Sequence, residues 1–482
     1  MANIHLTIDE KELEVPEGLT ILEAARQNGI HIPTLCYLKE LDPHASCRIC
    51  VVEVEGMRTF QPSCATKVRD GMVVHTNTEA VRANRKLTLE MIMAHHAVDC
   101  HHCLRIGNSK EEDLDPKFCE MCFFCDCVRD GICELQALNR EYHVDKLPFP
   151  VDGYRYEEDV SLHSVSRNAN KCVKCRRCVD VCQDVQTVHN LALYGRGQEY
   201  RVTPSMNKPM NESPCVRCGR CVDVCPTGAV YMEESIDNML ADAHAYGVKT
   251  VGMVSSTVLP ELEKLCKMEP GTLDLHKVIA GMKKEGVDCV VSEEQVLDQN
   301  LATAEELIQK AQGPVILSNS YGVKNFVREF FPELEEKVTF YPSLQQTFSA
   351  LAKEQLAAQF GWNPEQVKTV VFTANNENGA EAKEQGTADY SMNPREIYRT
   401  FLRTGVDLRR IKSTDPLKQN QDANYLYSPA TGPISFNYEK EPEVLRIGGK
   451  KVAIAHNLGQ CRTLLEEIAK GACPYDVVRL CA

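Results

Sequence analysis

The stretch NKCVKCRRCVDVCQ at residues 170–183 and its near copy SPCVRCGRCVDVCP at residues 213–226 decide the fold of this chain. Each has the spacing C-x2-C-x2-C-x3-C, in which three thiolates lie on one tight loop and the fourth crosses to a second cluster. The spacing therefore predicts two 4Fe–4S clusters. Two zinc sites would use pairs of C-x2-C and would leave the x3 thiols unexplained. The predicted ligand sets are Cys172, Cys175, Cys178 and Cys225, and Cys215, Cys218, Cys221 and Cys182.

The overall composition narrows the class of protein. The chain has 482 residues, enough for three or four domains. The sequence starts without the basic region and apolar core of a secretory signal peptide. Its 24 cysteines are therefore expected to bind metal in a reducing compartment, which predicts a cytoplasmic protein. The chain has no apolar run of about eighteen residues, so the sequence predicts no membrane span. The formal net charge of −14 disfavours nucleic acid as a partner.

Residues 1–78 predict a β-grasp domain that holds a 2Fe–2S cluster. An alternating strand at 4–8, a second strand that ends near Val15, and a helix capped by Thr20 are the start of such a fold. Four cysteines follow with the spacing C-x10-C-x2-C-x13-C. This pattern resembles the domain that begins the large iron–sulfur subunit of respiratory complex I and many iron-only hydrogenases. The predicted ligands are Cys36, Cys47, Cys50 and Cys64.

Residues 79–150 predict a helix followed by a second ligand-rich region. The same families continue with H-x3-C-x2-C-x5-C, and here HHAVDCHHC at 95–103 matches only its first three ligands, because Ser109 stands at the fourth. The region offers one suitable histidine and seven cysteines, which make two sets of four. In one interpretation the family cluster is 4Fe–4S and a second set holds an extra 4Fe–4S cluster. These sets are His96, Cys100, Cys103 and Cys133, and Cys119, Cys122, Cys125 and Cys127.

A second interpretation of this region stays open. Cys100, Cys103, Cys119 and Cys122 have the spacing of a zinc ribbon. The family cluster would then use a histidine with Cys125, Cys127 and Cys133. The sequence does not decide between zinc and an extra cluster.

Residues 151–238 form the predicted two-cluster ferredoxin domain, reached through the turn-rich stretch LPFPVDGY at 147–154. Basic residues surround its cysteines. They could form a docking patch for an acidic carrier such as ferredoxin, or they could compensate the charge of the clusters locally. We favour local compensation. The residues are Lys171, Lys174, Arg176, Arg177, Arg217 and Arg220.

Residues 239–482 change character, because cysteines become sparse and apolar strands alternate with helical segments. This pattern predicts an α/β domain with a parallel sheet, so the fold class of the whole chain is α+β multidomain. No glycine-rich nucleotide motif follows a strand. The five remaining cysteines are predicted to be buried free thiols. They are Cys266, Cys289, Cys461, Cys473 and Cys481.

The order of these parts resembles the catalytic subunit of iron-only hydrogenases over essentially the whole chain. GPVILSNSYGVKNFVREFFPEL at 313–334 and KKVAIAHNLGQCR at 450–462 are similar to family segments. The cysteines that hold the family's active-site cluster are absent, however. Asn319 and Ser320 stand at the first motif, Ala374 stands at the second, and the third would follow Ala482. The resemblance therefore implies a degenerate hydrogenase-like domain without an active-site cluster or catalytic residues.

The resemblance implies a non-catalytic electron-relay and scaffold subunit of a hetero-oligomer. More narrowly, the chain resembles the iron–sulfur subunit of the Stn-type (Sporomusa-type Nfn) electron-bifurcating transhydrogenase. That implies an FMN-containing NADH-binding subunit, an FAD-containing NADPH-binding subunit and ferredoxin as partners. It also implies one 2Fe–2S cluster and three or four 4Fe–4S clusters in this chain, with zinc as the alternative. Other interpretations are a relay for a separate formate dehydrogenase or hydrogenase chain, an active hydrogenase, and an iron–sulfur redox sensor.

Overall fold

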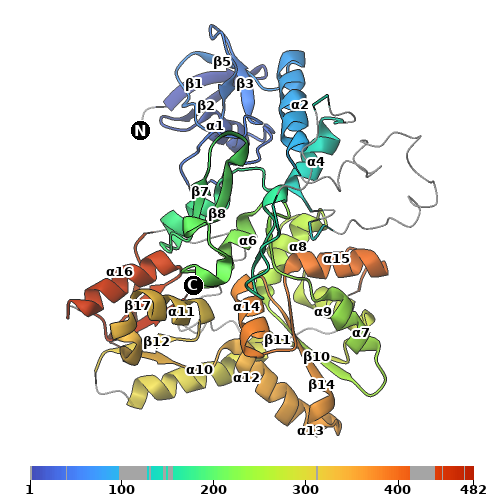
Figure 1. Ribbon diagram of the computed structural model, residues 1–482, viewed down its shortest axis with the longest axis vertical. Helices are drawn as coiled ribbons and strands as arrows, with labels where there is room; N and C mark the ends of the chain where they lie inside the picture. The colour runs from blue at the N-terminus through green and yellow to red at the C-terminus, as the bar shows by residue number, and fades with distance from the viewer. Residues whose placement is uncertain are drawn as a thin grey trace.

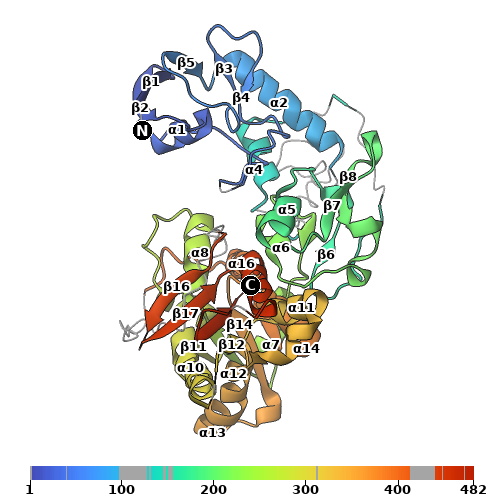
Figure 2. The same ribbon diagram turned by 90° about the vertical axis from the view of Figure 1, so that its left-hand side faces the viewer.

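The computed structural model describes residues 3–39, 41–96, 127–129, 132–144, 148–149, 156–310, 313–412, 440–447, 449–471 and 473–481. The N-terminal domain lies at one end of the molecule, and the C-terminal α/β domain lies at the other (Figure 1). The ferredoxin-like unit lies between them, as the turned view in Figure 2 also shows. Among the described residues, no helix is both long and apolar enough to cross a membrane.

The N-terminal domain is a five-stranded sheet packed on helix α1, and it contains the two strands and the helix that the sequence predicts. The strand order is β2-β1-β5-β3-β4. Thr20 caps α1 through a reciprocal capping box with Glu23, which fixes where the helix begins. The elements are β1 (Asn3–Ile8), β2 (Lys11–Pro16), α1 (Ile21–Gln27), β3 (Val51–Val54), β4 (Gln61–Pro62) and β5 (Met72–His75).

Helix α2 (Glu79–Ala94) connects this domain to the next and confirms the predicted helix. Its inner side packs on helix α4 (Glu134–Glu141) through a small core that includes Leu89, Met93 and Leu138. The buried Arg85 crosses this contact, where it donates to the Val51 carbonyl at 2.7 Å and to the Tyr142 hydroxyl at 2.9 Å. The helix is therefore tied both to the N-terminal sheet and to the segment after α4.

The ferredoxin-like unit contains two short helices, each preceded by one cysteine loop, and two small antiparallel pairs of strands. Helix α5 continues directly into a π-helical turn, η5. The elements are β6 (Ser166–Arg167), α5 (Arg177–Asp180), η5 (Val181–Val185), β7 (Leu191–Tyr194), β8 (Arg201–Pro204), α6 (Arg220–Val224) and β9 (Val230–Tyr231).

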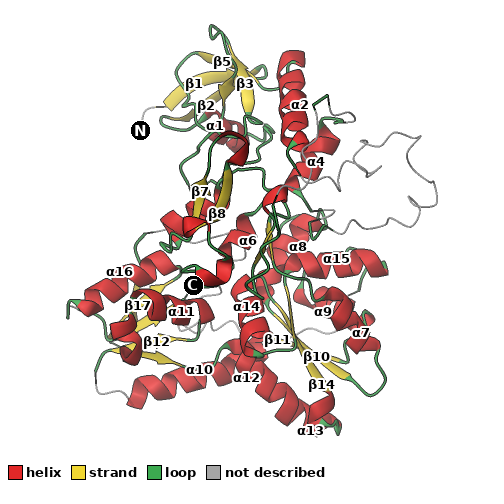
Figure 3. Ribbon diagram, in the orientation of Figure 1, coloured by secondary structure: helices red, strands yellow, loops and turns green. Residues whose placement is uncertain are grey.

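The C-terminal domain has two separate sheets, where the sequence predicted parallel sheet without showing that it would divide. The first has the order β11-β10-β14-β15 and is wholly parallel. Helices surround it, as Figure 3 shows. Its elements are α7 (Ile236–His244), β10 (Lys249–Val254), α8 (Leu259–Leu265), α9 (Leu275–Lys284), β11 (Cys289–Ser292), α12 (Leu344–Leu351), α13 (Ala357–Phe360), β14 (Val367–Phe372), α14 (Asn376–Gln385), β15 (Tyr390–Met392) and α15 (Pro394–Thr404).

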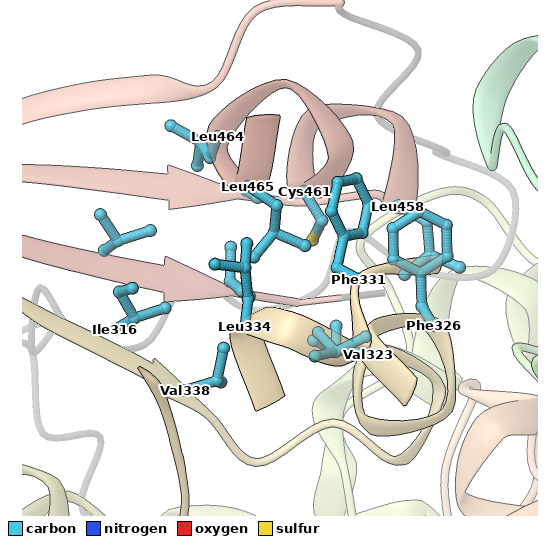
Figure 4. Packing of buried hydrophobic residues seen from close by; sticks show 14 of the residues in the cluster. Ile316, Val323, Phe326, Phe331, Leu334, Val338, Leu458, Cys461, Leu464 and Leu465 are labelled. Atoms are coloured by element: carbon cyan, nitrogen blue, oxygen red, sulfur yellow. The ribbon is translucent and has the colours of Figure 1, made fainter. Parts of the chain in front are cut away.

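The second sheet has the order β13-β12-β18-β17-β16, with only the edge strand β16 antiparallel. Helices α11 and α16 pack on it through the core of Phe326, Leu458, Leu465 and neighbours shown in Figure 4. Its elements are α10 (Glu293–Lys310), β12 (Val315–Ser318), α11 (Tyr321–Phe330), β13 (Val338–Phe340), β16 (Glu443–Ile447), β17 (Lys450–Ala455), α16 (Leu458–Ala469) and β18 (Val477–Leu480).

Candidate iron–sulfur centres

The two cysteine motifs have the same backbone geometry. Lys174 and Arg217, one residue before the second cysteine of each motif, have φ of 55° and 63°. Arg176 and Gly219, one residue after it, have φ of 72° and 74°. These left-handed residues fold each motif into a tight loop before its short helix begins. The two motifs therefore repeat each other in backbone conformation as well as in sequence.

The first predicted set of thiols surrounds one cavity. Cys172, Cys175, Cys178 and Cys225 all line it, and its empty space of about 410 Å³ is partly open to solvent. Cys225 comes from the second motif, so the fourth thiol at this cavity is contributed by the other cysteine loop. The Lys174 N–H lies 3.4 Å from the Cys172 sulfur, so the loop turns an amide toward that sulfur. Four thiols around a cavity fit a polynuclear cluster, because each binds a different iron.

Burial raises the pKa of the thiols in this first set. Desolvation is the main cause for Cys172, Cys175 and Cys178. The charged form is disfavoured in an apolar surrounding unless a cation compensates it. Metal binding at these thiols would therefore displace protons and would supply part of the folding free energy.

The second predicted set is also brought together. Cys182 from the first motif lies within electrostatic range of Cys215, Cys218 and Cys221. Burial raises the pKa of all four thiols, that of Cys215 to about 11. The Asn190 N–H lies 3.3 Å from the Cys182 sulfur. Cys182 and Cys218 also pack against the core of the second C-terminal sheet, so this set lies against the C-terminal domain.

The N-terminal set is arranged as two pairs of thiols. The sulfurs of Cys50 and Cys64 lie 3.3 Å apart. A hydrogen bond with Cys47 lowers the pKa of Cys36, and one with Cys64 lowers the pKa of Cys50. The same bonds raise the pKa of Cys47 and Cys64. All four thiols interact, which fits four ligands of one small cluster.

Within the described parts of the chain, no group of three or more His, Cys, Asp or Glu side chains is arranged to hold a single metal ion.

The predicted ligands between 96 and 133 are only partly described. His96 is buried just after α2, and Cys133 is buried at the N-cap of α4. The Cys127 sulfur would lie only 3.0 Å from a β-carbon on Gly228, so glycine lets this segment pack on the ferredoxin-like unit. Cys100, Cys103, Cys119, Cys122 and Cys125 lie outside the described residues. The choice between zinc and an extra cluster stays a prediction.

The arginines around the ferredoxin cysteines form ion pairs within the chain. Arg177 pairs with Glu134 at 2.8 Å and Arg217 pairs with Glu384 at 2.6 Å. Arg176 and Arg220 lie near Asp180 and Asp223 of their own helices. These four side chains are therefore engaged internally, in agreement with the interpretation of local compensation.

The segments that follow β12 and β14, where the resemblance placed the absent cysteines, are filled by other side chains. Ser320 caps α11, and its hydroxyl donates to the Glu377 carboxylate at 2.7 Å. The Gly322 N–H donates to the same oxygen at 2.6 Å. Ala374 is buried after β14, and its N–H lies 3.3 Å from the Thr257 hydroxyl. A buried carboxylate therefore joins the segments that follow β12 and β14.

The acidic face of α14 was not predicted from the sequence. Glu377, Glu381 and Glu384 recur at helical spacing and all point into polar networks. Burial raises the pKa of Glu377, and that of Glu381 to about 7. Glu384 accepts from the Tyr321 hydroxyl at 2.8 Å and from Ser164, besides pairing with Arg217. The sequence signal that could have predicted this face is the helical spacing of three glutamates in the segment that forms α14.

Three segments of the chain match models of known protein families. Residues 1–79 match a 2Fe–2S iron–sulfur cluster binding domain. Residues 163–231 match the ferredoxin-like domain of NADH-quinone oxidoreductase subunit 3. Residues 248–482 match the C-terminal domain of the iron only hydrogenase large subunit. The chain is similar to iron-only hydrogenase large subunits. The predicted 2Fe–2S, ferredoxin-like and hydrogenase-like parts are thereby confirmed.

Curated relatives extend this hydrogenase-like similarity. The NADP-reducing hydrogenase subunit HndD of Solidesulfovibrio fructosivorans is 32% identical over 384 residues, which cover 75% of this chain and 60% of that protein. A subunit of the NADH-quinone oxidoreductase of Rhizobium meliloti is 39% identical over 203 residues, 42% of this chain and 21% of that protein. The chain thus spans less than two thirds of the length of either relative.

A solved structure with partial likeness is an NAD+-reducing NiFe-hydrogenase in the H2-reduced state. It is 27% identical, with a TM-score of 0.40, and the match covers 48% of this chain and 88% of that one.

Proposed function

We propose that this chain is an iron–sulfur electron-relay and scaffold subunit of an NAD(P)-linked oxidoreductase complex. The observation that carries the proposal is the pair of crossed thiol sets, Cys172, Cys175, Cys178 and Cys225 beside Cys182, Cys215, Cys218 and Cys221. Each bound cluster would take up and release one electron. Neighbouring sets on one small unit suit passage of electrons through the chain.

The geometry of the C-terminal domain supports a relay without hydrogenase turnover. Ser320 and Ala374 offer no thiolate, and Glu377 already bonds the Ser320 hydroxyl and the Gly322 amide. A bridged diiron group needs soft ligands at these positions. We propose that this domain serves instead to cover the second thiol set and to support partner subunits.

The names of the relatives support a link to nicotinamide nucleotides. They include an NADP-reducing hydrogenase, an NADH-quinone oxidoreductase and an NADPH-Fe(3+) oxidoreductase of Geobacter sulfurreducens. The finer proposal is a cytoplasmic flavin-based electron-bifurcating transhydrogenase of the Stn type. It would join an FMN-containing NADH-binding subunit and an FAD-containing NADPH-binding subunit and would exchange electrons with ferredoxin.

Anaerobic purification of the native complex tests this proposal. We expect an FMN-containing and an FAD-containing subunit to co-purify with the chain. In that complex, Cys218→Ala should abolish electron flow between subunits, because it removes a ligand of the second set, and should leave NADH oxidation by an artificial dye intact. Cys289→Ala is the matched control, because Cys289 is a half-buried thiol of strand β11 outside every ligand set.

The outcomes separate the candidate functions. Retained flow in Cys218→Ala would remove the relay. A molybdopterin or diiron subunit in place of the flavin subunits would keep the relay and change its terminal acceptor to formate or hydrogen. Purification of the chain alone, with one labile cluster, would favour a redox sensor.

A further inference from the structure

A groove between the N-terminal domain and the first ferredoxin motif brings two ligand sets to one surface. Cys47 of the N-terminal set and Cys172 of the first ferredoxin set both line it. The empty space of the groove is about 990 Å³, much of it open to solvent. Helix α2 forms one side, so the groove lies where the 2Fe–2S domain meets the ferredoxin-like unit.

Two cations of this groove lack an anionic partner among the described residues. Arg48 follows Cys47 and Lys174 precedes Cys175, each inside a C-x2-C loop, with φ of 57° and 55°. Neither side chain forms an ion pair or side-chain hydrogen bond with the residues that the structure describes. They differ in this from the four arginines of the ferredoxin motifs, which pair internally. No carboxylate is among the described residues that line the groove.

The side of the groove formed by α2 is apolar and exposed. Met91 is 45% exposed, and Leu87, one turn earlier on the same helix face, is 44% exposed. Ile92 and Val173 lie half-buried in the groove wall. An exposed apolar centre beside cations that have no ion pair among the described residues is typical of a protein docking surface.

We propose that this groove is the docking site for a small acidic one-electron carrier protein. The proposal rests on the relay function proposed above. The chain as a whole carries a net charge of −14, so an acidic carrier is repelled over most of its surface and is steered to a cationic groove. Docking there would bring the carrier beside Cys47 and Cys172 at once. The exchange moves one electron from the reduced carrier to this chain, leaves the carrier oxidised, and moves no proton or bond.

Calorimetric binding of a purified two-cluster 4Fe–4S ferredoxin to the native complex tests the site. We expect Arg48→Glu, Lys174→Glu and Met91→Glu each to weaken binding about tenfold, and the remaining affinity to depend less on salt. Arg48 and Lys174 lie between proposed ligands, so the paramagnetic resonance signals of the clusters must be unchanged in those variants. Met91→Glu lies on α2 and is not part of a ligand loop, so it keeps the test decisive if those signals change in the other two variants.

Lys267→Glu is the matched control. Lys267 is an exposed lysine of the C-terminal domain with φ of 54°, so it shares the backbone conformation of Arg48 and Lys174. We expect the Lys267→Glu complex to bind ferredoxin with an affinity within about twofold of the native value. Unchanged ferredoxin binding in all three groove variants, with electron flow intact, would overturn the docking site and leave the relay standing. Loss of a flavin subunit from Met91→Glu with unchanged ferredoxin binding would also overturn it, because the groove would then be a subunit interface. Absence of clusters from the chain would overturn the relay itself.

Discussion

Gly219 shows how one residue fixes the second cysteine loop against the C-terminal domain. It has φ of 74°, and a β-carbon there would lie 2.7 Å from the Asn376 β-carbon. Arg176 holds the equivalent place in the first loop with φ of 72°, so the conformation alone does not demand glycine. Glycine is required at position 219 because the loop approaches α14 so closely.

Gly219→Ala should therefore destabilise the contact by about 1–3 kcal/mol beyond the backbone strain. Gly29→Ala measures that strain alone, because Gly29 has φ of 71° and nothing within 4 Å of an added β-carbon. Anaerobic thermal denaturation of both variants checks the difference. Equal midpoints for the two variants would show that the loop does not press on α14.

Glu381 predicts a pH-dependence of stability. Its ordinary pKa of 4.5 is raised to about 7 by burial, with Glu377 raising it and Ser343, Gln345 and Lys324 lowering it. The unfolded chain releases this proton at lower pH than the folded chain does, so stability falls as pH rises from about 4.5 to 7. Glu381→Gln should remove this loss and stabilise the protein by about 2–3 kcal/mol at pH 8.

Chemical denaturation of Glu381→Gln between about pH 5.5 and 8.5 measures this effect. The advantage over the native protein should grow with pH. The exposed Glu336 provides the control, since Glu336→Gln should leave the native profile unchanged. A constant difference across the range would contradict the assignment.

At the scale of elements, helix α16 holds the end of the first cysteine motif. The Arg462 guanidinium lies 5.0 Å from the ring centroids of both Phe326 and Phe330. It also donates to the Thr187 carbonyl and hydroxyl, both at 3.0 Å. The Leu458 N–H donates to the Gln186 side chain at 2.9 Å. The segment after Cys182 is therefore fixed by α16.

Arg462→Ala should lower the free energy of unfolding by about 2–4 kcal/mol, since it removes a stacked cation and hydrogen bonds to a buried loop. It should also speed the loss of the second cluster in air. Arg410→Ala is the control, because Arg410 is 87% exposed and pairs only with Asp407 among the described residues. We expect a change of less than about 0.5 kcal/mol there. Anaerobic denaturation and the decay of visible absorption measure the two effects.

The sequence predicts elements better than their arrangement. Thr20 marked the start of α1, and the alternation of apolar and helical segments over residues 239–482 predicted parallel sheet there. The division into two sheets was not predictable, because a parallel strand buried on both faces carries no pattern that names its neighbours. The thiol sets were predictable from spacing, whereas the Glu377 bridge needed the fold, because its partners Ser320 and Gly322 lie more than fifty residues away.

At the scale of the whole molecule, the metal content of the purified chain tests the region from 96 to 133. The extra-cluster interpretation predicts about 18 iron atoms per chain and no zinc. The zinc-ribbon interpretation predicts about 14 iron atoms and one zinc. Metal analysis by mass spectrometry separates the two.

We propose that the chain is a relay of several clusters. An anaerobic redox titration of the purified chain, followed by electron paramagnetic resonance, distinguishes a relay from a protein with one cluster. A relay should give several iron–sulfur signals that appear at graded low potentials, with magnetic interaction between the two clusters of the ferredoxin-like unit. A single labile cluster, or none, would contradict it.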